Sequence, residues 1–352
     1  MDNYTKNQLH TFTKEVFIKC GMPLDDAIQA ADVLLSADMR GIDSHGVARL
    51  SGYVRLHEAG RANMKANWKI IHQTPSTATI DADQGLGLVV APHAMDIAIE
   101  KAKQVGTGWV AIQNSNHFGI AAYHAMKALP HDMIGVAMTN ASPLVAPTHS
   151  KQRMLGTNPI CMVFPAGKHL PIVADMATSA AANGKLEIAQ RSGKEIPKGW
   201  VQTKDGMESV DANELKKGGS LLPLGGHKGY ALASIVDIMT SVLSGANYGP
   251  WVPPFVAFLN PLENLPGKGI GHFVGAMRID AFRPAEDFKS HIDNWIDAFK
   301  NAERIDEKQK VIIPGEPEFW MQAEREKNGI PLNDLVEKDL LELGEKLGVS
   351  LK

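Results

Sequence analysis

The sequence predicts an α/β fold with helices at both ends of the chain, and three observations support this prediction. Within the first sixty of the 352 residues, apolar side chains such as Leu9, Phe12, Val16 and Phe17 recur at helical spacing. The middle of the chain alternates short apolar runs with longer helical patterns, which is typical of an α/β protein. The tail, residues 333–347, is again amphipathic at helical spacing.

Three helices are expected before the first strand. Thr5 and Gln8 have the spacing of a capping box and predict the start of the first helix. Pro23 opens the second helix, which is expected to stop at Gly41, because proline is favoured at a helix start and glycine just after a helix end. The third helix is expected to end at Gly60.

The middle of the chain is expected to alternate strands and helices. Strands are predicted at residues 69–72, 77–81, 109–113, 134–139, 160–164, 171–174, 255–259 and 272–279. Helices are predicted at residues 85–106, 119–129, 229–243 and 288–299. Residues 229–243 are strongly apolar and predict a buried helix, whereas residues 190–225, rich in Gly, Lys and Ser, predict a long excursion.

Composition excludes several classes of protein. Hydrophobic residues make up 44% of the chain and the formal net charge is −3, so a basic nucleic-acid surface is not expected. No apolar run approaches the roughly 20 residues that cross a bilayer, and the N-terminus lacks a signal pattern. The two cysteines, Cys20 and Cys161, suggest reduced thiols, so we expect a cytoplasmic protein without membrane or nucleic-acid partners.

Residues 40–49, RGIDSHGVAR, concentrate chemically active side chains between the second and third helices. His45 can move a proton near neutral pH, and Arg49 offers a planar fork that matches a carboxylate. A loop between rigid elements is a common place for catalytic residues. Taken alone, however, this stretch is better explained by a solvated polar turn between two helices.

Three familiar motifs were tested and rejected. Residues 85–90, GLGLVV, follow a strand, but Val90 replaces the third glycine of a dinucleotide fingerprint and the next strand ends at Gln113 instead of an acid. Ser44 lies in G-x-x-S-x-G, which is not the G-x-S-x-G of a nucleophile elbow. The thirteen histidines include no HExxH pair, so no metal site is predicted.

Other motifs lie where ligands often bind. His117 follows a strand and precedes Gly119, and residues 156–159 form a tight turn before an apolar strand. Asp175 ends another apolar run, and residues 225–230 form a glycine-rich helix start that would suit a pyrophosphate. Each feature also has a structural explanation, such as a helix cap or a surface turn.

As a set, these motifs resemble one family across essentially the whole chain. In order they are DSHGVAR, NHFG, GTNPI, DMATS, GHKGYAL and PGEPE. They resemble the malate and L-lactate dehydrogenases of the second type, which are distinct from the Rossmann-fold enzymes. That family also contains ureidoglycolate dehydrogenase, 2,3-diketo-L-gulonate reductase, sulfolactate dehydrogenase and an imine reductase for cyclic amino acids.

The resemblance implies a non-Rossmann nucleotide-binding domain with a largely antiparallel sheet, plus a helical domain built from both chain ends. The implied boundaries are 1–70 with 285–352 for the helical domain, 71–130 for a small α/β segment and 131–284 for the NAD(P)-binding domain. It also implies a homodimer with the active site near the interface. NAD is the expected cofactor, with NADP left open.

The resemblance also implies residue roles. His45 and His117 are the two candidate proton donors and acceptors, with His117 favoured by its place at a strand end. Ser44 and Arg49 are expected to bind the substrate, and Arg49 is expected to bind the carboxylate of the substrate. Thr157 and Asn158 are expected beside the nicotinamide. The remaining residues expected to line the nucleotide are Asp175, Met176, Ala177, Thr178, Ser179, His227, Lys228, Gly315, Glu316 and Pro317.

The expected reaction is hydride transfer between NAD(P) and a 2-hydroxy or 2-oxo acid, most simply malate/oxaloacetate or lactate/pyruvate. A second substrate carboxylate would need another cation, for which His149, Lys151 and Arg153 are near in sequence. Another oxo acid or an imine within the family is the alternative. A serine hydrolase using Ser44 and His45, and a non-catalytic binding protein, are the alternatives from other classes.

Overall fold

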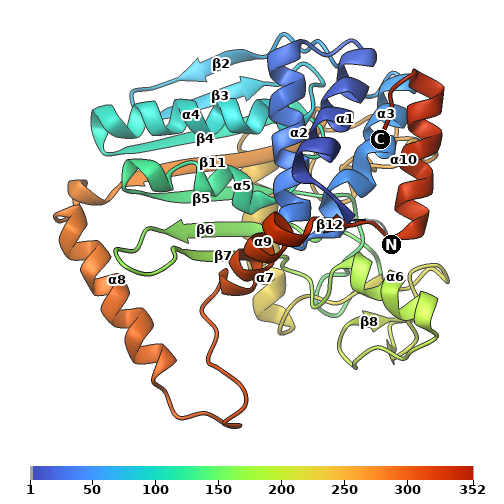
Figure 1. The fold of residues 1–352 in the computed structure, drawn as a ribbon. Coiled ribbons are helices and arrows are strands. Elements are labelled where there is room, and N and C mark those ends of the chain that lie inside the picture. Colours follow the sequence, from blue (N-terminus) through green and yellow to red (C-terminus); the bar gives the residue numbers. More distant parts are fainter. Residues whose placement is uncertain (1–2, 352) are drawn as a thin grey trace.

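The computed structural model describes residues 3–351 and is built around one large sheet with helices on both faces (Figure 1). The helices are α1 (Lys6–Lys19), α2 (Leu24–Met39), α3 (Leu50–Glu58), α4 (Gly87–Val105), α5 (Ala121–Met126), α6 (Asn183–Ser192), α7 (His227–Asp237), α8 (Ala285–Lys300), α9 (Glu316–Asn328) and α10 (Asp334–Leu347). The strands of the large sheet are β2 (Lys69–Gln73), β3 (Thr77–Asp81), β4 (Thr107–Ser115), β5 (Met133–Thr139), β6 (Ile160–Phe164), β7 (Ile172–Met176) and β11 (Ile270–Arg278).

The large sheet has seven strands in the order β2-β3-β4-β11-β5-β6-β7. Its neighbours are antiparallel except for β3 and β4, which run parallel and are joined through α4. The sheet is therefore mixed and largely antiparallel, as expected. Two small sheets accompany it, formed by β8 (Val201–Gln202), β9 (Glu208–Ser209) and β10 (Ser220–Leu221), and by β1 (Asn3–Tyr4) with β12 (Ile330–Pro331).

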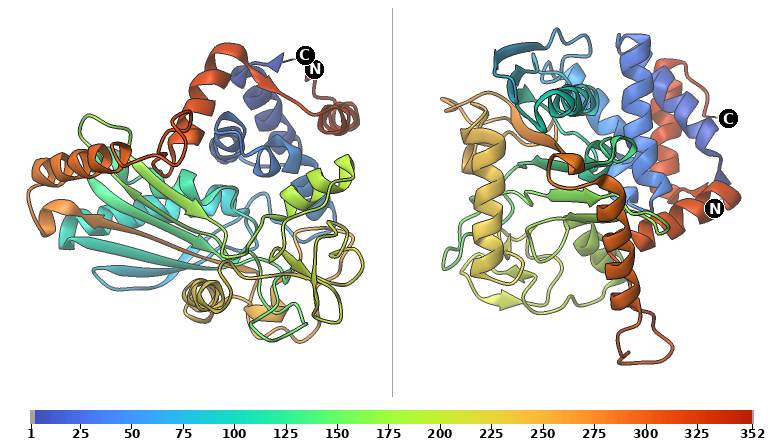
Figure 2. Two further views of the ribbon diagram at one scale, coloured as in Figure 1. Left: turned by 90° about the horizontal axis from the view of Figure 1, so that it is seen from below. Right: turned by 90° about the vertical axis from the view of Figure 1, so that its left-hand side faces the viewer.

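Both faces of the large sheet are covered by helices, because side chains along its central strands alternate between two apolar clusters. Val110 and Ile112 of β4 pack with α4 and α5, whereas Trp109 and Ala111 point to the other face and pack with α7. The views in Figure 2 show these layers, with the sheet between α4 and α7. A strand buried on both faces reads as a continuous apolar run, which is why the sequence located these strands well.

The two ends of the chain meet in one helical layer. Leu9, Leu34, Tyr53 and Leu340, from α1, α2, α3 and α10, share an apolar core, and β1 pairs with β12 beside it. The capping box is confirmed, since the Thr5 side chain accepts from the Gln8 N–H and the Gln8 side chain accepts from the Thr5 N–H. Figure 1 shows these helices from the two ends of the chain on one side of the molecule.

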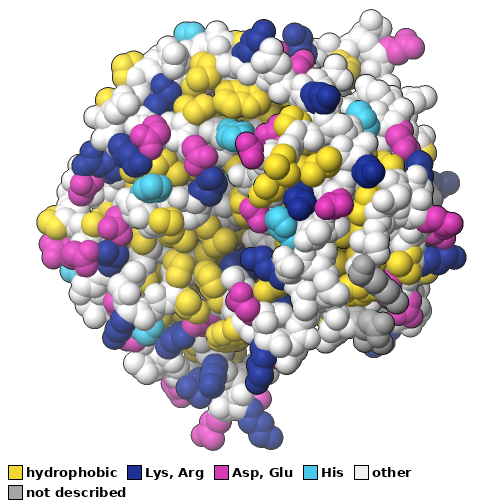
Figure 3. Space-filling view, turned by 45° about the horizontal axis from the view of Figure 1, so that its top comes forward, with side chains coloured by type: hydrophobic (Ala, Val, Ile, Leu, Met, Phe, Trp, Pro, Cys, Tyr) yellow, Lys and Arg dark blue, Asp and Glu magenta, His cyan; other side chains and the backbone are white. Residues whose placement is uncertain are grey.

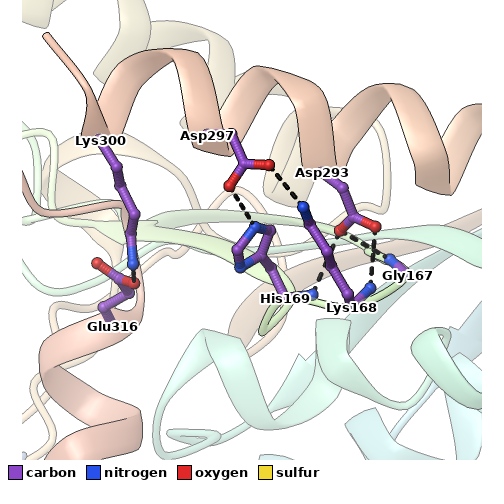
Figure 4. A network of polar contacts seen from close by, with 7 residues as sticks. All are labelled: Gly167, Lys168, His169, Asp293, Asp297, Lys300 and Glu316. Carbon is purple, nitrogen blue, oxygen red and sulfur yellow. Dashed lines mark hydrogen bonds and ion pairs between the residues drawn. The ribbon is translucent and has the colours of Figure 1, made fainter.

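Helix α8 packs elsewhere, against β7 and the chain before α9, where Ile296 contacts Ile172 and Ile313. The Asp293 carboxylate accepts three backbone N–H groups, from residues 167, 168 and 169, at 2.9–3.3 Å. Asp297 pairs with Lys168 and His169 (Figure 4). Helix α8 thus lies apart from α1, α2, α3 and α10, although the predicted helical domain of residues 1–70 and 285–352 included it. The division into domains stays a prediction.

Four elements differ from the sequence-based expectations. The strand predicted at residues 255–259 is irregular, because Pro253 and Pro254 precede it and Arg61 binds its carbonyls. The helix predicted at 229–243 is α7 followed by a π-helical turn, Ile238–Val242, and only one of its faces is buried: Val236 is buried against the sheet, whereas Ile238 is 54% exposed. The excursion predicted at 190–225 contains the β8-β9-β10 sheet. It overlaps the last residues of α6, a helix that was not predicted. PGEPE, expected as a turn, begins α9.

The surface in Figure 3 carries acidic and basic side chains interspersed with apolar ones, without a large area of one sign on that face. Among residues 3–351, no helix has the length and apolar character needed to cross a membrane. No group of three or more His, Cys, Asp or Glu side chains among them is placed to hold a metal ion.

Candidate active site

The turn between α2 and α3 is built by close backbone packing. Two 3₁₀ turns, Asp43–His45 and Val47–Arg49, meet at Gly46. A Cβ on Gly46 would lie 2.0 Å from Asp38 Oδ1, so only glycine fits beside that buried carboxyl. Asp38 in turn accepts the Val47 N–H at 2.8 Å. Burial raises the pKa of Asp38 to about 8, so this carboxyl is largely protonated at neutral pH.

Arg325 of α9 holds the other side of the same turn. Its guanidinium donates to the Asp38 carbonyl and binds both oxygens of the Asp43 carboxylate, one of them at 3.2 Å. A two-pronged contact of this kind restricts orientation as well as distance. His45 is therefore presented by a turn that is fixed from α2 and from α9.

His117 lies in the loop after β4, which packs against the start of α4. A Cβ on Gly87 would come 2.5 Å from the Asn116 carbonyl, so the glycine of the rejected fingerprint serves close packing here. His124 donates to the Phe118 carbonyl at 2.7 Å, and His272 donates to the Asn116 carbonyl at 3.0 Å. Two buried histidines thus hold the backbone on either side of His117.

The two candidate histidines meet although they come from different layers. Their rings stack with centroids 5.7 Å apart. The Tyr53 hydroxyl lies 2.6 Å from His117 Nδ1, and the Gly119 N–H donates to the same nitrogen at 3.3 Å. The Gly119 N–H can only donate, so this contact favours the proton on Nε2 in the free ring, whereas the Tyr53 hydroxyl can either donate to Nδ1 or accept a proton from it. Phe255 also packs on the His117 ring, at 4.6 Å between centroids.

Both imidazoles are neutral in the free protein. Burial, with a smaller contribution from the positive charge of Arg49, lowers the pKa of His45 to about 4. Burial also lowers the pKa of His117 well below its usual value, assisted by the charges of His45 and Arg49. Two adjacent imidazoles and a guanidinium disfavour further positive charge, so this cluster is suited to a negatively charged ligand.

Ser44 and Arg49, the predicted substrate residues, lie beside His45. Ser44 Oγ is 2.8 Å from His45 Nδ1, and Arg49 Nε donates to the Ser44 carbonyl at 2.6 Å. The start of α6 closes this side, since a Cβ on Gly184 would lie 3.4 Å from Ser44 Cβ. No carboxylate among residues 3–351 is hydrogen-bonded to His45, so the Ser44–His45 pair lacks the third member of a hydrolase triad.

A cavity of about 400 Å³ lies between β7, α5 and the start of α9, a size usual for small-molecule sites. The predicted nucleotide residues Asp175, Met176, Gly315 and Pro317 line it. Gly315 has φ 97°, and a Cβ there would lie 2.8 Å from Val173 Cβ, which explains the glycine. Burial raises the pKa of Asp175 to about 6.

Arg40 adds an unexpected cation to this cavity. The Arg40 guanidinium lies over the Phe319 ring, with its carbon 4.7 Å from the ring centroid. Within residues 3–351, Arg40 Nε and Nη1 are buried without a hydrogen-bond partner. Unsatisfied buried donors are rare in proteins, and here they fit an acceptor-rich group such as a phosphate or ribose.

Other predicted nucleotide residues are turned into the protein. The Asn158 amide accepts from the Ala141 N–H at 3.1 Å and donates to the Ala233 carbonyl at 3.1 Å, and Thr178 Oγ1 donates to the Thr157 carbonyl at 3.0 Å. Ser179 donates to Ala181. These side chains shape the backbone of the site, which favours a supporting role over direct contact with a nucleotide.

The remaining predicted residues are spread around these two groups. Glu316 faces Lys300 and accepts the Ile313 N–H at 3.0 Å, so its carboxylate braces the loop (Figure 4). Ala177 is half-buried between Met176 and Thr178. His227 and Lys228 are exposed at the start of α7, whose preceding residues Gly225 and Gly226 line a second cavity of about 390 Å³.

The cations suggested for a second carboxylate are not gathered at the histidines. Arg153 donates to the carbonyls of Leu215 and Gly219, and Lys151 is exposed. His149 lines the second cavity. The role suggested for them in binding a second carboxylate therefore stays a prediction.

Sequence reasoning missed four residues that complete the site: Arg40, Tyr53, Phe255 and Arg325. From the sequence, Tyr53 was recognised only as an apolar position of the third helix, and Phe255 only as the first residue of a predicted strand. Arg40 was inside the central stretch but had no assigned role. Arg325 had no local signal, since its partners, Asp38 and Asp43, are far away in the sequence.

Comparisons with known proteins point to one family. A sequence model of the malate/L-lactate dehydrogenase family matches residues 4–341. A malate dehydrogenase from Pyrococcus abyssi is 42% identical over 99% of this chain and 96% of its own length. An L-sulfolactate dehydrogenase from Methanocaldococcus jannaschii is 39% identical over 96% of this chain and 95% of its own.

Solved structures extend the similarity to the whole fold. The sulfolactate dehydrogenase from Methanocaldococcus jannaschii superposes with a TM-score of 0.91 at 36% identity, covering 99% of this chain and 98% of that one. The malate dehydrogenase from Pyrococcus horikoshii superposes with a TM-score of 0.89 at 38% identity, covering 99% and 96%. With its sequence motifs, its fold and these relatives in agreement, the chain belongs to the malate/L-lactate dehydrogenase family.

Proposed function

We propose that this protein is an NAD-dependent 2-hydroxy acid dehydrogenase, with malate and oxaloacetate as its main substrate pair. The observation that carries the proposal is the stacked His45–His117 pair beside Arg49 and Ser44. Malate dehydrogenases from two Pyrococcus species, each 42% identical, support the choice of substrate. A sulfonated analogue is the second candidate, because relatives named sulfolactate dehydrogenases are 39% and 35% identical.

In this proposal a histidine handles the proton and the arginine orients the substrate. Arg49 binds the C1 carboxylate, which sets C2 and its oxygen toward the histidine pair. His117 Nε2, the ring nitrogen turned away from Tyr53, exchanges a proton with the C2 oxygen. For oxidation the neutral ring carries its own proton on Nδ1, donated to the Tyr53 hydroxyl, and takes the substrate hydroxyl proton on Nε2; for reduction the doubly protonated ring returns that proton from Nε2. The negative charge of the bound acid favours the protonated ring that reduction requires.

The cavity next to β7 is proposed to hold part of NAD. Bound there, NAD supplies or accepts the hydride at substrate C2. Arg40 would bind phosphate or ribose oxygens with its free donors, and Asp175 and Pro317 would line the nucleoside. The carboxylates of Asp175 and Glu318 line the same cavity and would accept hydrogen bonds from ribose hydroxyls, which is the reason for proposing NAD as the cofactor.

The homodimer also belongs to this proposal. Ile235, Ile238, Val242 and Leu243 form an exposed apolar stripe along α7 and the π-helical turn after it. Contiguous exposed apolar side chains on one helix face usually mark an association surface. We expect this stripe to be covered by the second subunit.

The test is a spectrophotometric panel at 340 nm with NADH and then NADPH. The substrates are oxaloacetate, pyruvate, 2-oxoglutarate, a diketo sugar acid, sulfopyruvate and a cyclic imine. Oxidation of NADH by oxaloacetate at the highest kcat/KM is the expected result. Preference for sulfopyruvate selects the second candidate, and silence on every oxo acid contradicts the proposal. A serine-directed inhibitor that leaves turnover unchanged dismisses the hydrolase alternative.

A further inference from the structure

The irregular segment from Pro253 to Leu262 crosses the active site and places one aromatic ring on it. The Phe255 ring lies 4.6 Å from the His117 ring and 4.9 Å from the Tyr53 ring, measured between centroids. A Cβ on Gly52 would lie 3.5 Å from Phe255 Cε1, so the ring also contacts the backbone of α3. Phe255 therefore forms an apolar wall directly beside the proposed proton-transfer residue.

A single arginine holds this segment in place. Arg61 Nη1 donates to the carbonyls of Val256 and Leu259 at 3.1 and 2.8 Å, and Nη2 donates to the carbonyl of Pro254 at 2.5 Å. These three acceptors flank Phe255 on both sides in the chain. The planar guanidinium fork can fix several carbonyls at once, which a lysine cannot do in the same geometry.

The other large apolar side chains of the segment do not share this position. Phe258 is 83% exposed, and Leu259 and Leu262 are also exposed. The segment thus contributes little to the core of this chain, while Phe255 is turned inward. Its ring packs at the edge of the apolar core of the helical layer, against Tyr53, and covers His117 from there.

The geometry also indicates which part of a substrate would meet this wall. The Nδ1 side of His117 is occupied by Tyr53 and the Gly119 N–H, so the C2 oxygen must approach Nε2. The C1 carboxylate is directed to Arg49. The group left over is the C3 substituent, which must pass the ring face of His117 where Phe255 lies.

We propose that Phe255, positioned by Arg61, is a specificity-determining residue that limits the bulk of the C3 substituent of the 2-oxo acid. This inference rests on the proposed function. A phenyl wall accepts a small methylene or methyl group and excludes a second ring. Removing it opens space without removing the proton donor or the carboxylate ligand.

The experiment compares Phe255→Ala with wild type, using oxaloacetate, pyruvate and phenylpyruvate with NADH. The expected result is a rise of about tenfold or more in the ratio of kcat/KM for phenylpyruvate to that for pyruvate. Phe255→Leu should give a smaller rise in the same direction and keeps the test usable if the alanine variant does not fold. Arg61→Lys should also raise the ratio, because a lysine cannot hold the three carbonyls around Phe255 as the guanidinium does.

Phe282→Ala is the matched control, since Phe282 is 79% exposed and lies after β11 in the next turn of the chain. It should leave the ratio unchanged. An unchanged ratio in folded Phe255 variants, with wild-type activity on oxaloacetate intact, overturns this inference alone. A wild-type protein that reduces no 2-oxo acid overturns the proposed function, and the inference with it.

Discussion

At the residue scale, the two histidines of the site differ in their hydrogen-bond partners. His45 is held by Ser44 at the end of a turn, whereas His117 is held at Nδ1 by Tyr53 and Gly119. The contacts of His117 fix its ring and leave Nε2 free to exchange a proton with the substrate, as a general acid–base requires. This difference strengthens the preference for His117 that its place after a strand first suggested.

The variant His117→Ala is expected to lose turnover by roughly 10²–10⁴-fold, the usual worth of a general acid–base. NADH affinity should be nearly unchanged, because the proposed nucleotide residues, Arg40 and Asp175, line a separate cavity. Steady-state kinetics at 340 nm and NADH fluorescence titration measure the two effects. His45→Ala is the comparison: if His117→Ala keeps most of its activity, the proton-transfer role passes to His45.

Gly46→Ala is expected to destabilise the protein and to lower activity, because the new Cβ would overlap the Asp38 carboxyl at 2.0 Å. Overpacking of this kind costs about 1–3 kcal/mol, occasionally more. Gly52→Ala, in α3, is the control, since its Cβ makes an ordinary 3.5 Å contact. Urea denaturation compares the two variants, and equal stability would contradict the role assigned to Gly46.

At the element scale, α9 connects the nucleotide cavity to the catalytic turn. Its first residues, with Gly315, line the cavity, and Phe319 covers Arg40. Two turns later Arg325 binds Asp43 and the backbone of Asp38. Helix α8 braces the same region through the Lys300–Glu316 pair. A rigid helix spanning both groups explains how residues so distant in sequence keep a common geometry.

Arg325→Ala is expected to lower stability by about 1–3 kcal/mol and to reduce kcat, because a buried carbonyl and the Asp43 carboxylate lose their donor. Arg55→Ala is the matched control. Arg55 pairs with Asp339 at 3.7 Å on the surface, where an ion pair contributes about 1 kcal/mol or less. Denaturation and kinetics of both variants check this, and equal losses would argue against a special role for α9.

At the scale of the whole molecule, the proposed dimer depends on the exposed stripe of α7. Ile238→Lys places a charge in its centre and is expected to shift the protein toward monomers, measured by analytical ultracentrifugation at micromolar concentration. Ile305→Lys, on an exposed loop after α8, should leave the assembly unchanged. A monomeric wild type, or an unaffected Ile238→Lys dimer, would remove this surface from the proposal.

Acid should destabilise the fold through its buried histidines. Burial lowers the pKa of His124 to about 4 and that of His272 to about 3, below the 6.5 of an exposed imidazole. The unfolded chain therefore binds more protons between pH 6.5 and 4, so stability falls as pH falls through this window. The loss between pH 7 and pH 5 is on the order of 2 kcal/mol for each histidine.

Urea denaturation at pH 7 and pH 5 measures this effect, and His124→Gln should show a weaker dependence. Asp38 acts in the opposite direction, since its pKa is raised to about 8 and its folded form keeps a proton that the unfolded chain loses above pH 4. Asp38→Asn should therefore increase the difference between the two pH values. Equal slopes in all three proteins would contradict the assigned protonation states.

Much of the architecture was determined by the sequence alone. Short apolar runs located all seven strands of the large sheet. The signal is clearest for β5 and β11, which are buried on both faces and almost continuously apolar, whereas the edge strand β2 is exposed along its length. The capping box at Thr5 marked α1 correctly, since that signal lies within one helical turn. The motifs around His45 and His117 marked the histidine site for the same reason: each is a short run of residue types with a local chemical meaning.

Only the tertiary structure decided how these parts combine. Nothing local to Phe255 or Arg325 tells that one packs on His117 and the other binds Asp43, because those contacts join segments far apart in sequence. The apolar run of α7 could not distinguish burial from an exposed stripe, since hydrophobicity alone does not say which surface covers it. For the same reason, the sequence could not show that the side chains of Asn158 and Thr178, predicted as ligand residues, donate hydrogen bonds to backbone carbonyls.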